Sequence, residues 1–383
     1  MATSTKIGSF TVVGTRPIRH DGLDKVTGNA RFSNDVNLPG LLYGQVLRSP
    51  HSHAIIKSID TSRAEALEGV KAVTTSADFP QLSGLVEDLV EGSLHNFLFM
   101  SNNILAKDKV LYKGHAIAAV AATTTQIAEA AIGLIEVEYD VLKPVTDARE
   151  AMKSGAPILH PRLVSMSNAA LRPGGYRKEE EDGEETNIAN HFEFRLGDVE
   201  QGFKESDEIV EREFHTSPVH QGYIEPHAAT AQWNADGKLT IWSSSQGQFM
   251  VREQTSRVLN IPISQIKAVP MEIGGGFGGK LLVYLEPVVA VLSRKSGHPV
   301  KIAMSRADVL EATGPTAGSH IKVRMGATKD GKLTAGEAWL AYESGAYPGG
   351  MLGEGVLQWK DSAEDEAMDK TRQQIVEDDK VKK

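Results

Sequence analysis

In the first part of the chain, short apolar segments alternate with segments whose apolar residues have helical spacing. The segments with the length and pattern of strands are residues 41–48, 54–60, 70–74, 116–121 and 134–139. Helices are predicted directly after two of them, at 61–67 and 125–133. Residues 79–96 mix acidic and apolar side chains without a period, so we expect a loop there. Short strands interleaved with helices predict an α+β domain over residues 21–153.

The alternation resumes in a second predicted domain, residues 191–350. Its predicted strands are residues 208–215, 228–233, 239–243, 266–273, 299–304, 320–327 and 333–341, and its predicted helix is 248–259. Asp330-Gly331 is a hairpin-turn signal between the last two strands. An apolar run over 281–292 predicts a buried helix with Pro287 inside its first two turns.

Polar and charged segments flank these two domains. Residues 1–20 are expected to be a loosely ordered N-terminal lead, and the charged residues 154–190 an exposed linker. After the linker, Asp198 precedes apolar Val199 and Phe203, which is the pattern of a capped helix. Residues 351–383 are rich in charge, and an isolated polar helix or a disordered tail is expected there.

Composition narrows the possible functions. The chain has 383 residues, a formal net charge of −9 and a pI near 5.8, so we expect no nucleic-acid partner. It contains no cysteine, which excludes disulfides, cysteine-ligated zinc, iron–sulfur clusters and thiol nucleophiles from this chain. The first residues have no apolar core of a signal peptide, and no run of about 18 apolar residues occurs. We therefore expect a cytoplasmic protein that does not enter a membrane.

A glycine-rich turn is the strongest chemical signal in the chain. Five glycines surround Phe277 between residues 274 and 279, and Lys280 follows. Between a predicted strand and a predicted helix, such a turn presents backbone N–H groups to an anionic or oxo ligand. A glycine corner that serves only close strand–helix packing is the alternative.

Two nucleotide motifs match this turn in part. Gly274-x-Gly276-x-x-Gly279 satisfies the dinucleotide fingerprint, but basic residues at 294–301 stand where an acidic ribose partner is expected. The phosphate-loop pattern ends in Leu281, where a magnesium ligand requires Ser or Thr. A nucleotide-binding protein remains an open alternative.

Several separated motifs give the turn a wider context. They are Gly28-Asn-Ala-Arg-Phe-Ser-Asn-Asp35, Leu47-Arg-Ser-Pro-His-Ser-His-Ala54, Ile135-Glu-Val-Glu-Tyr-Asp-Val-Leu-Lys-Pro144, Tyr223-Ile-Glu-Pro-His227, Ser244-Ser-Gln246-Gly-Gln-Phe and Gly274-Gly-Gly-Phe-Gly-Gly-Lys280. In this order they resemble the large molybdopterin-binding subunit of the xanthine dehydrogenase/aldehyde oxidase family, which includes carbon monoxide dehydrogenase-like large subunits. The resemblance covers residues 10–349. It implies an α/β hammerhead domain followed by the first part of a molybdopterin-binding α+β domain.

The resemblance also implies a function, a molybdenum hydroxylase that oxidises a carbon centre with water as the oxygen source. Its molybdenum is held through the pterin dithiolene, so no protein metal ligand is expected, and the pterin is expected in its cytosine dinucleotide form. The residues implied to bind this cofactor are Gln246, Gly275, Gly276, Phe277, Gly278 and Gly279. Iron–sulfur clusters and FAD are expected only on partners, a small and a medium subunit. The single chain is expected to be inactive without them.

The chain departs from the family pattern near Pro348. The family's glutamate base and its substrate-facing arginine are not matched, so the catalytic residue is unknown. Glu225 and Glu272 are the nearby candidates to replace the base, although structural work is favoured for both. Leu281 stands where some members with purine substrates carry a glutamate, which argues against such a substrate. Aromatic heterocycles, aldehydes and carbon monoxide stay open.

Five histidines lie in or near these motifs. They are His51, His53, His115, His220 and His227. They show no metal-ligand spacing on one helix face, so we expect hydrogen-bonding or loop roles.

Two interpretations of the departure from the pattern remain. In one, the chain is half of a split subunit, and a separate C-terminal half completes the site. In the other, it is a truncated and inactive fragment that leaves apolar surface exposed.

Overall fold

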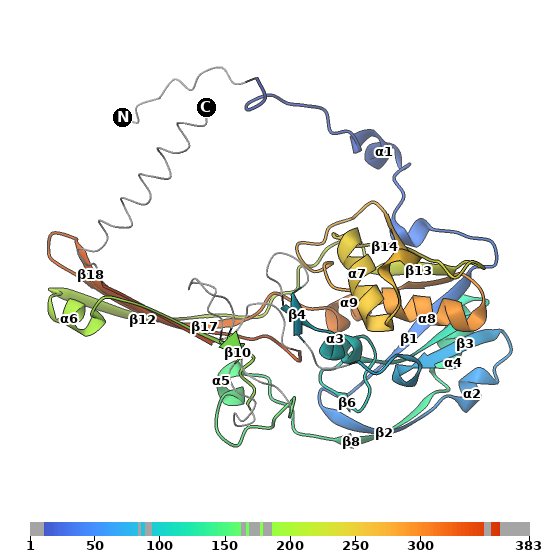
Figure 1. The fold of residues 1–383 in the computed structure, drawn as a ribbon, viewed down its shortest axis with the longest axis horizontal. Helices are drawn as coiled ribbons and strands as arrows, with labels where there is room; N and C mark the ends of the chain where they lie inside the picture. Colours follow the sequence, from blue (N-terminus) through green and yellow to red (C-terminus); the bar gives the residue numbers. More distant parts are fainter. Residues whose placement is uncertain are drawn as a thin grey trace.

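The central sheet of the molecule is built by strands from both predicted domains. The structure is a computed structural model that describes residues 11–82, 86–88, 94–161, 166–167, 177–178, 186–347 and 354–360. In order, the sheet contains β15 (Ile266–Pro270), β14 (Leu239–Ser243), β13 (Ala228–Trp233), β16 (Val300–Ala303), β1 (Leu42–Arg48), β7 (Ala116–Ala122) and β3 (Val70–Thr75). Strand β1 pairs in parallel with β16, with Leu42 opposite Val300. Regions predicted as separate domains therefore share one sheet (Figure 1).

Helices cover the faces of this sheet and bury its apolar strands. Every residue of β7 is buried, as expected for a strand covered on both sides. Helix α8 (Glu286–Ser296) packs on β13, and α4 (Thr125–Ile132) packs on β1 and β7. Helix α7 (Gln248–Leu259) spans the residues predicted for it and packs on β15. The main core joins residues from both halves of the sequence, among them Leu42 and Leu292.

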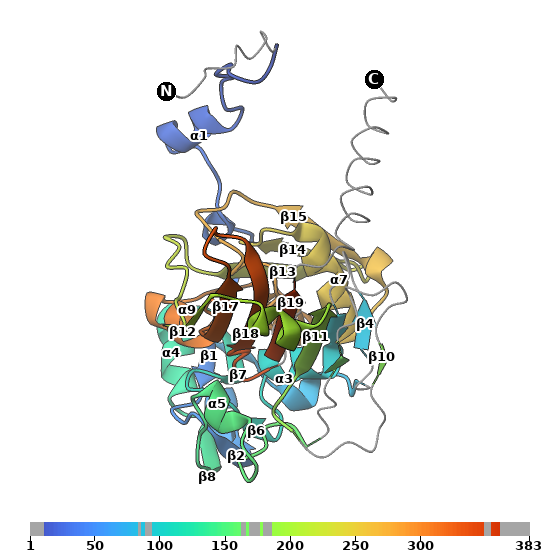
Figure 2. The same ribbon diagram turned by 90° about the vertical axis from the view of Figure 1, so that its left-hand side faces the viewer.

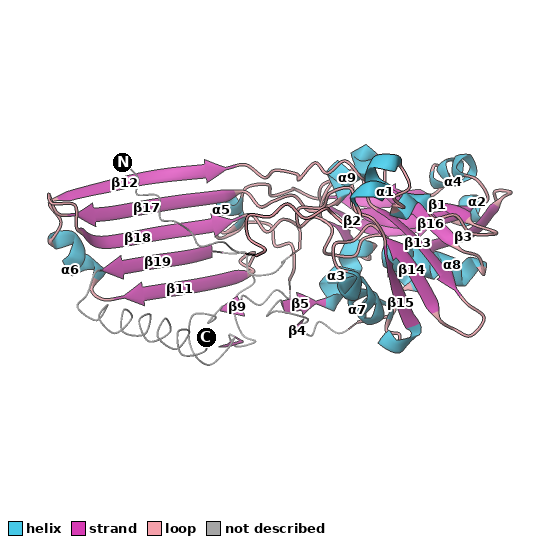
Figure 3. Cartoon of the chain, turned by 90° about the horizontal axis from the view of Figure 1, so that it is seen from above, coloured by secondary structure: helices cyan, strands magenta, loops and turns pink. Residues whose placement is uncertain are grey.

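A second seven-stranded sheet extends away from this body. It consists of β10 (Arg177–Lys178), β9 (Met166–Ser167), β11 (Asn190–Leu196), β19 (Glu354–Lys360), β18 (Leu333–Tyr342), β17 (Ser319–Ala327) and β12 (Glu208–Thr216). Figure 3 shows its longer strands side by side and apart from the helices of the body. Helix α6 (Val199–Lys204) packs on it, with Phe203 buried against Ala335. Asp198 caps α6 as predicted, since its Oδ1 accepts the N–H of Gln201 at 2.9 Å.

Strand β19 corrects the expectation for the charged tail. Residues 354–360 form neither a polar helix nor a disordered segment, but a strand between β11 and β18. The charge that dominates residues 351–383 lies mostly after this segment, whereas Val356 and Trp359 have high β-propensity. Backbone bonds from two neighbouring strands then outweigh the local composition. Residues 361–383 lie outside the described part of the chain, as do 1–10 and most of the linker.

The glycine turn is not followed directly by a helix, contrary to the sequence prediction. Strand β15 ends at Pro270 rather than at residue 273, and α8 begins at Glu286 rather than at residue 281. Pro287 consequently lies in the first turn of α8, the position where its missing N–H costs no helical hydrogen bond. Side chains hold the intervening loop, since Gln254 accepts the N–H of Val283 at 3.0 Å.

The remaining elements surround this framework. A three-stranded sheet contains β6 (Lys109–Val110), β2 (Ala54–Asp60) and β8 (Glu136–Val141), and a hairpin of β4 (Val86–Asp88) and β5 (Leu94–Asn96) replaces part of the loop predicted at 79–96. The other helices are α1 (Gly22–Thr27), α2 (Ser62–Glu65), α3 (Phe97–Ile104), α5 (Ala148–Ala151) and α9 (Arg306–Ala312), with 3₁₀ turns at Ser33–Asp35, Ser76–Asp78 and Ile263–Gln265. Figure 2 shows α1 standing away from the body. Among the helices of the described residues, none has the length and apolar character needed to cross a membrane. Mixed sheets with interspersed helices confirm the predicted α+β class.

Candidate functional site

The glycine turn adopts a backbone that few other residues tolerate. Gly275 has φ of 97° and Gly278 has φ of 85°, both in the left-handed region. Phe277 also has a positive φ, 51°, which is uncommon for a residue with a side chain. This phenylalanine is 73% exposed. The turn therefore carries a strained residue at an exposed point.

The other three glycines are required by space. A Cβ atom at Gly274, Gly276 or Gly279 would lie closer than 3.0 Å to a neighbouring side chain. Those neighbours are Glu225, Gln246 and Tyr223, respectively. The turn is thus packed directly against the two motifs that precede it in the sequence.

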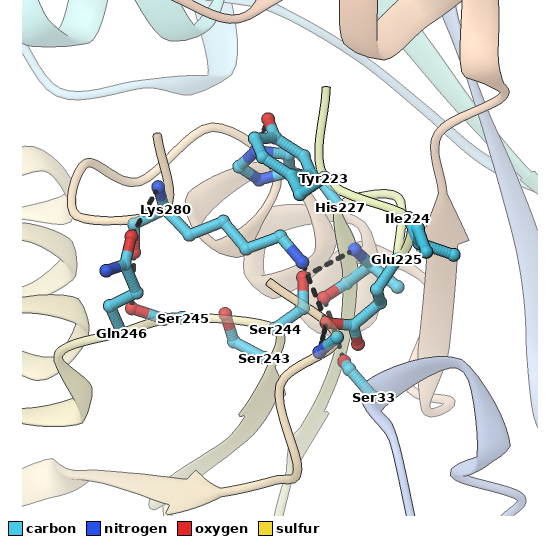
Figure 4. Close-up of polar contacts among 12 residues, drawn as sticks. Ser33, Tyr223, Ile224, Glu225, His227, Ser243, Ser244, Ser245, Gln246 and Lys280 are labelled. Carbon is cyan, nitrogen blue, oxygen red and sulfur yellow. Dashed lines mark hydrogen bonds and ion pairs between the residues drawn. The ribbon is translucent and has the colours of Figure 1, made fainter. Parts of the chain in front are cut away.

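Gln246 is bonded to the turn through its amide oxygen. Its Oε1 accepts the N–H of Gly278 at 3.0 Å and the N–H of Lys280 at 3.2 Å. Its own backbone N–H donates to the carbonyl of Lys280 at 2.9 Å. These bonds direct the amide nitrogen, a donor, away from the turn (Figure 4).

Three successive backbone donors of the turn are unused. Within the described part of the chain, no acceptor bonds the N–H of Gly275, Gly276 or Phe277. Consecutive N–H groups in a turn with left-handed residues form a concave site for anionic or oxo groups. Together with the amide nitrogen of Gln246, they make a set of donors without acceptors.

A buried ion pair lies behind the turn. Lys280 Nζ is 2.7 Å from Glu225 Oε2, and the Lys280 side chain has no exposed surface. The same carboxylate oxygen accepts the N–H of Gly274 at 2.8 Å. Figure 4 shows the Lys280 side chain extending from the turn toward Glu225. Burial lowers the pKa of Lys280, and the bond to Glu225 opposes that shift.

A chain of hydrogen bonds lies next to this pair. Tyr223, whose ring centroid lies 4.8 Å from Lys280 Nζ, has its hydroxyl 2.7 Å from His227 Nε2 and 3.2 Å from Thr313 Oγ1. His220 Nε2 lies 2.8 Å from Thr313 Oγ1. Burial, helped by the charge of Lys280, lowers the pKa of His227 to about 3, so this ring is neutral at pH 7.

Comparison with known proteins identifies the family. The model described as "Molybdopterin cofactor-binding domain" matches residues 180–360, and "Aldehyde oxidase and xanthine dehydrogenase, a/b hammerhead domain" matches residues 27–143. The nicotinate dehydrogenase large molybdopterin subunit of Eubacterium barkeri is 30% identical over 338 residues, which are 88% of this chain and 72% of that protein. The chain belongs to the xanthine dehydrogenase/aldehyde oxidase family.

Other members of the family are considerably longer. A probable xanthine dehydrogenase subunit of Bacillus subtilis is 35% identical over 342 residues, which cover 89% of this chain but 41% of that protein. Carbon monoxide dehydrogenase from Oligotropha carboxidovorans has the same fold with a TM-score of 0.72 and 28% identity, over 90% of this chain and 44% of its own. Aldehyde oxidoreductase from Desulfovibrio gigas gives a TM-score of 0.69 and 25% identity, over 85% and 34%. The chain thus spans about two fifths of most of these relatives.

In this family member, both candidate replacements for the base are engaged in ion pairs. Glu225 is held by Lys280, and Glu272 is paired with Lys25, which joins α1 to the segment after β15. The contacts of both glutamates therefore indicate the structural role that the sequence analysis favoured. Among the described residues, no group of three or more His, Asp or Glu side chains is arranged to bind a metal ion.

Four of the five histidines make side-chain hydrogen bonds, and the ring of His51 lies edge-on to that of Tyr139 with centroids 4.9 Å apart. His53 Nδ1 lies 2.9 Å from the carbonyl of Lys143, and His115 Nε2 lies 2.8 Å from that of Asn102. Burial lowers the pKa of His115 to about 4. His220 and His227 belong to the chain of hydrogen bonds around Tyr223.

The sequence motifs do not indicate that the side chains of Lys280 and Glu286 are buried. The phosphate-loop pattern places Lys280 at the ligand, yet its ammonium points into the protein and cannot contact a phosphate at the turn. Glu286 is buried at the start of α8, where its carboxylate accepts from Ser243 and from the N–H groups of Tyr284 and Leu285, and burial raises its pKa. A single glutamate in an otherwise apolar run is the available signal for Glu286.

Proposed function

We propose that this chain presents the glycine turn and Gln246 as one wall of a molybdopterin pocket in a molybdenum hydroxylase. The cofactor-binding residues are then Gln246, Gly275, Gly276, Phe277, Gly278 and Gly279. The observation that carries the proposal is the set of donors without acceptors, three successive N–H groups and an outward amide nitrogen. Such donors fit the oxo and phosphate groups of a pterin cofactor.

In this site, the residues of the chain bind and orient rather than transfer protons. When bound, the molybdopterin, in our proposal the cytosine dinucleotide form, supplies the molybdenum at which a carbon centre is oxidised with oxygen from water. The Gln246 amide nitrogen would donate to an oxygen of that group, while the amide oxygen is held by the N–H groups of Gly278 and Lys280. The turn N–H groups provide preorganised partial positive charge beside it.

The general base is proposed to come from a complementary half-subunit. Glu225 and Glu272 are both committed to ion pairs, so neither is available as a base. Ile224 and Phe249, in the segments that carry Glu225 and Gln246, are 87% and 84% exposed, which is apolar surface of the kind that partner chains cover. The nicotinate dehydrogenase subunit, of which this chain covers 72%, is a precedent for a shorter molybdopterin chain.

Electron acceptors are proposed on further partners, an iron–sulfur small subunit and an FAD-binding medium subunit. The chain has no cysteine with which to ligate a cluster. The substrate stays open among aromatic heterocycles, aldehydes and carbon monoxide. The exposed apolar Leu281 beside the turn offers no polar group to a purine. The cytoplasmic location expected from the sequence stays a prediction.

Metal and pterin analysis tests the proposal. The chain is purified alone and after coexpression with chains encoded next to it, and molybdenum and oxidised pterin are measured per polypeptide. We expect negligible cofactor alone and near one equivalent in the complex. Near-stoichiometric molybdenum in the single chain would contradict the need for a complementary half. No cofactor in any complex would favour an inactive fragment.

A further inference from the structure

One carboxylate oxygen ties the two ends of the glycine turn together. Glu225 Oε2 accepts the N–H of Gly274, the first residue of the turn, at 2.8 Å. It also pairs with the ammonium of Lys280, the residue that closes the turn, at 2.7 Å. The three unused N–H groups lie between these two anchors.

Stability alone does not account for this ion pair. Removing a lysine and a glutamate from water is unfavourable, and a buried pair is often no more stabilising than apolar residues of the same volume. Here Glu225 Oε1 is also buried without a hydrogen-bond partner, which is a further cost. What the pair supplies is a fixed geometry at both ends of the turn.

The surroundings of Lys280 allow little alternative placement. Its side chain has no exposed surface and its ammonium lies over the ring of Tyr223, which is itself bonded to His227. Gln246 fixes the middle of the turn through Gly278. The strained φ of Phe277 persists only if such contacts hold the backbone.

We propose that Glu225 and Lys280 are positioning residues that set the spacing of the turn's ends and so aim the N–H groups of Gly275, Gly276 and Phe277 at the bound cofactor. The identity of that ligand rests on the proposed function. The rigidity of the turn does not, and it is measurable in the chain without any cofactor.

Amide hydrogen exchange of the full chain is the first measurement. Lys280→Met removes the ammonium and keeps a side chain of similar length. We expect the hydrogen-bonded amides of the turn, those of Gly274, Gly278 and Lys280, to exchange at least about tenfold faster, because one end of the turn loses a charge-assisted hydrogen bond. Peptides from α7 and β13 keep their rates. Glu225→Gln retains an acceptor for Gly274 and gives a smaller increase. The matched control Lys295→Met breaks a surface pair with Asp78 of 2.8 Å and leaves the turn unchanged.

Unchanged exchange in the turn of Lys280→Met would overturn the proposal. If every peptide of that variant exchanges faster, the double variant Glu225→Gln/Lys280→Met is measured, because it leaves no unpaired charge. It distinguishes a local effect on the turn from a loss of overall stability. A local increase in the double variant supports positioning, and a global increase shows a role in stability alone and overturns it.

Cofactor content of the assembled complex is the second measurement. We expect pterin and molybdenum per chain to fall at least about tenfold in Lys280→Met while subunit association is unchanged, with Glu225→Gln retaining more than Lys280→Met. Wild-type content in Lys280→Met would contradict the effect on the cofactor. A wild-type complex without pterin, combined with local loosening in the variant, would refute the proposed function and leave the positioning role intact.

Discussion

At the scale of single residues, we propose that Gln246 uses the two polar atoms of its amide for two functions. The oxygen holds the turn through Gly278 and Lys280, and the nitrogen is the donor presented outward. Gln246→Glu keeps an acceptor for the turn and removes the donor. We expect wild-type exchange in the turn but a fall in kcat of about 10²–10³ in the assembled enzyme, the usual effect of losing one oriented donor.

The control for this substitution is Gln265→Glu, the same chemical change at an exposed residue in the 3₁₀ turn before β15. It is expected to leave both measurements at wild-type values. A Gln246→Glu enzyme with normal turnover would remove the amide nitrogen from the proposed site.

His227 predicts a dependence of stability on pH. Its pKa is about 3 in the folded chain and near 6.5 when unfolded, so the unfolded state binds the extra proton between these values. The contribution of His227 is complete above pH 6.5 and is lost as the pH falls toward 3. Between pH 6.5 and 5 the loss approaches about 2 kcal/mol.

The measurement is urea unfolding at pH 7 and pH 5 for the wild type and His227→Gln. The variant keeps a polar partner for Tyr223 but does not titrate, so its stability falls less over this interval. Equal losses in the two proteins would show that His227 does not carry the effect.

The candidate site is only partly predictable from its residues. Gln246 and the glycines stand in recognisable motifs, and their assignment as cofactor ligands stays a prediction. The reason for Gly274, Gly276 and Gly279, however, is contact with Glu225, Gln246 and Tyr223, which approach the turn only after folding. The inward direction of Lys280 is likewise set by a carboxylate far away in sequence.

At the scale of elements, the cap of α6 gives a direct test of stability. Asp198 Oδ1 accepts the N–H of Gln201, and α6 buries Phe203 against the second sheet. Asp198→Ala is expected to lower the free energy of unfolding by about 1 kcal/mol. Asp198→Asn retains the acceptor and is expected to stay close to wild type. Equal losses in both variants, measured by urea unfolding, would assign the effect to charge rather than to capping.

Elements with a strong period are predictable, and those decided by distant partners are not. Helix α7 matches its prediction because its apolar positions and the following Pro262 are local signals. Strand β19 differs from its prediction because one of the two strands that it pairs with, β11, is distant in sequence. The late start of α8 depends on Gln254 and Glu286, which hold the preceding loop in a conformation that apolarity alone does not indicate.

At the scale of the whole molecule, the division of the sequence into family domains differs from the division of the structure into sheets and cores. Family models divide the chain at residues 27–143 and 180–360, whereas the central sheet and the main core cross that division. The predicted domain boundaries, 21–153 and 191–350, therefore describe sequence segments that fold against each other. The second sheet is the part that lies apart from this shared core (Figure 3).

The parallel pairing of β1 with β16 has a consequence for the order of events during synthesis. Leu42 leaves the ribosome long before its partner Val300, so the early segment must wait with one edge of β1 unpaired. Such high contact order slows folding and gives chaperones a long interval in which to bind. Residues 21–153 expressed alone are expected to lack a cooperative unfolding transition and to gain one when residues 191–350 are supplied. A cooperative transition in the isolated segment would show that the early half matures without its later partner.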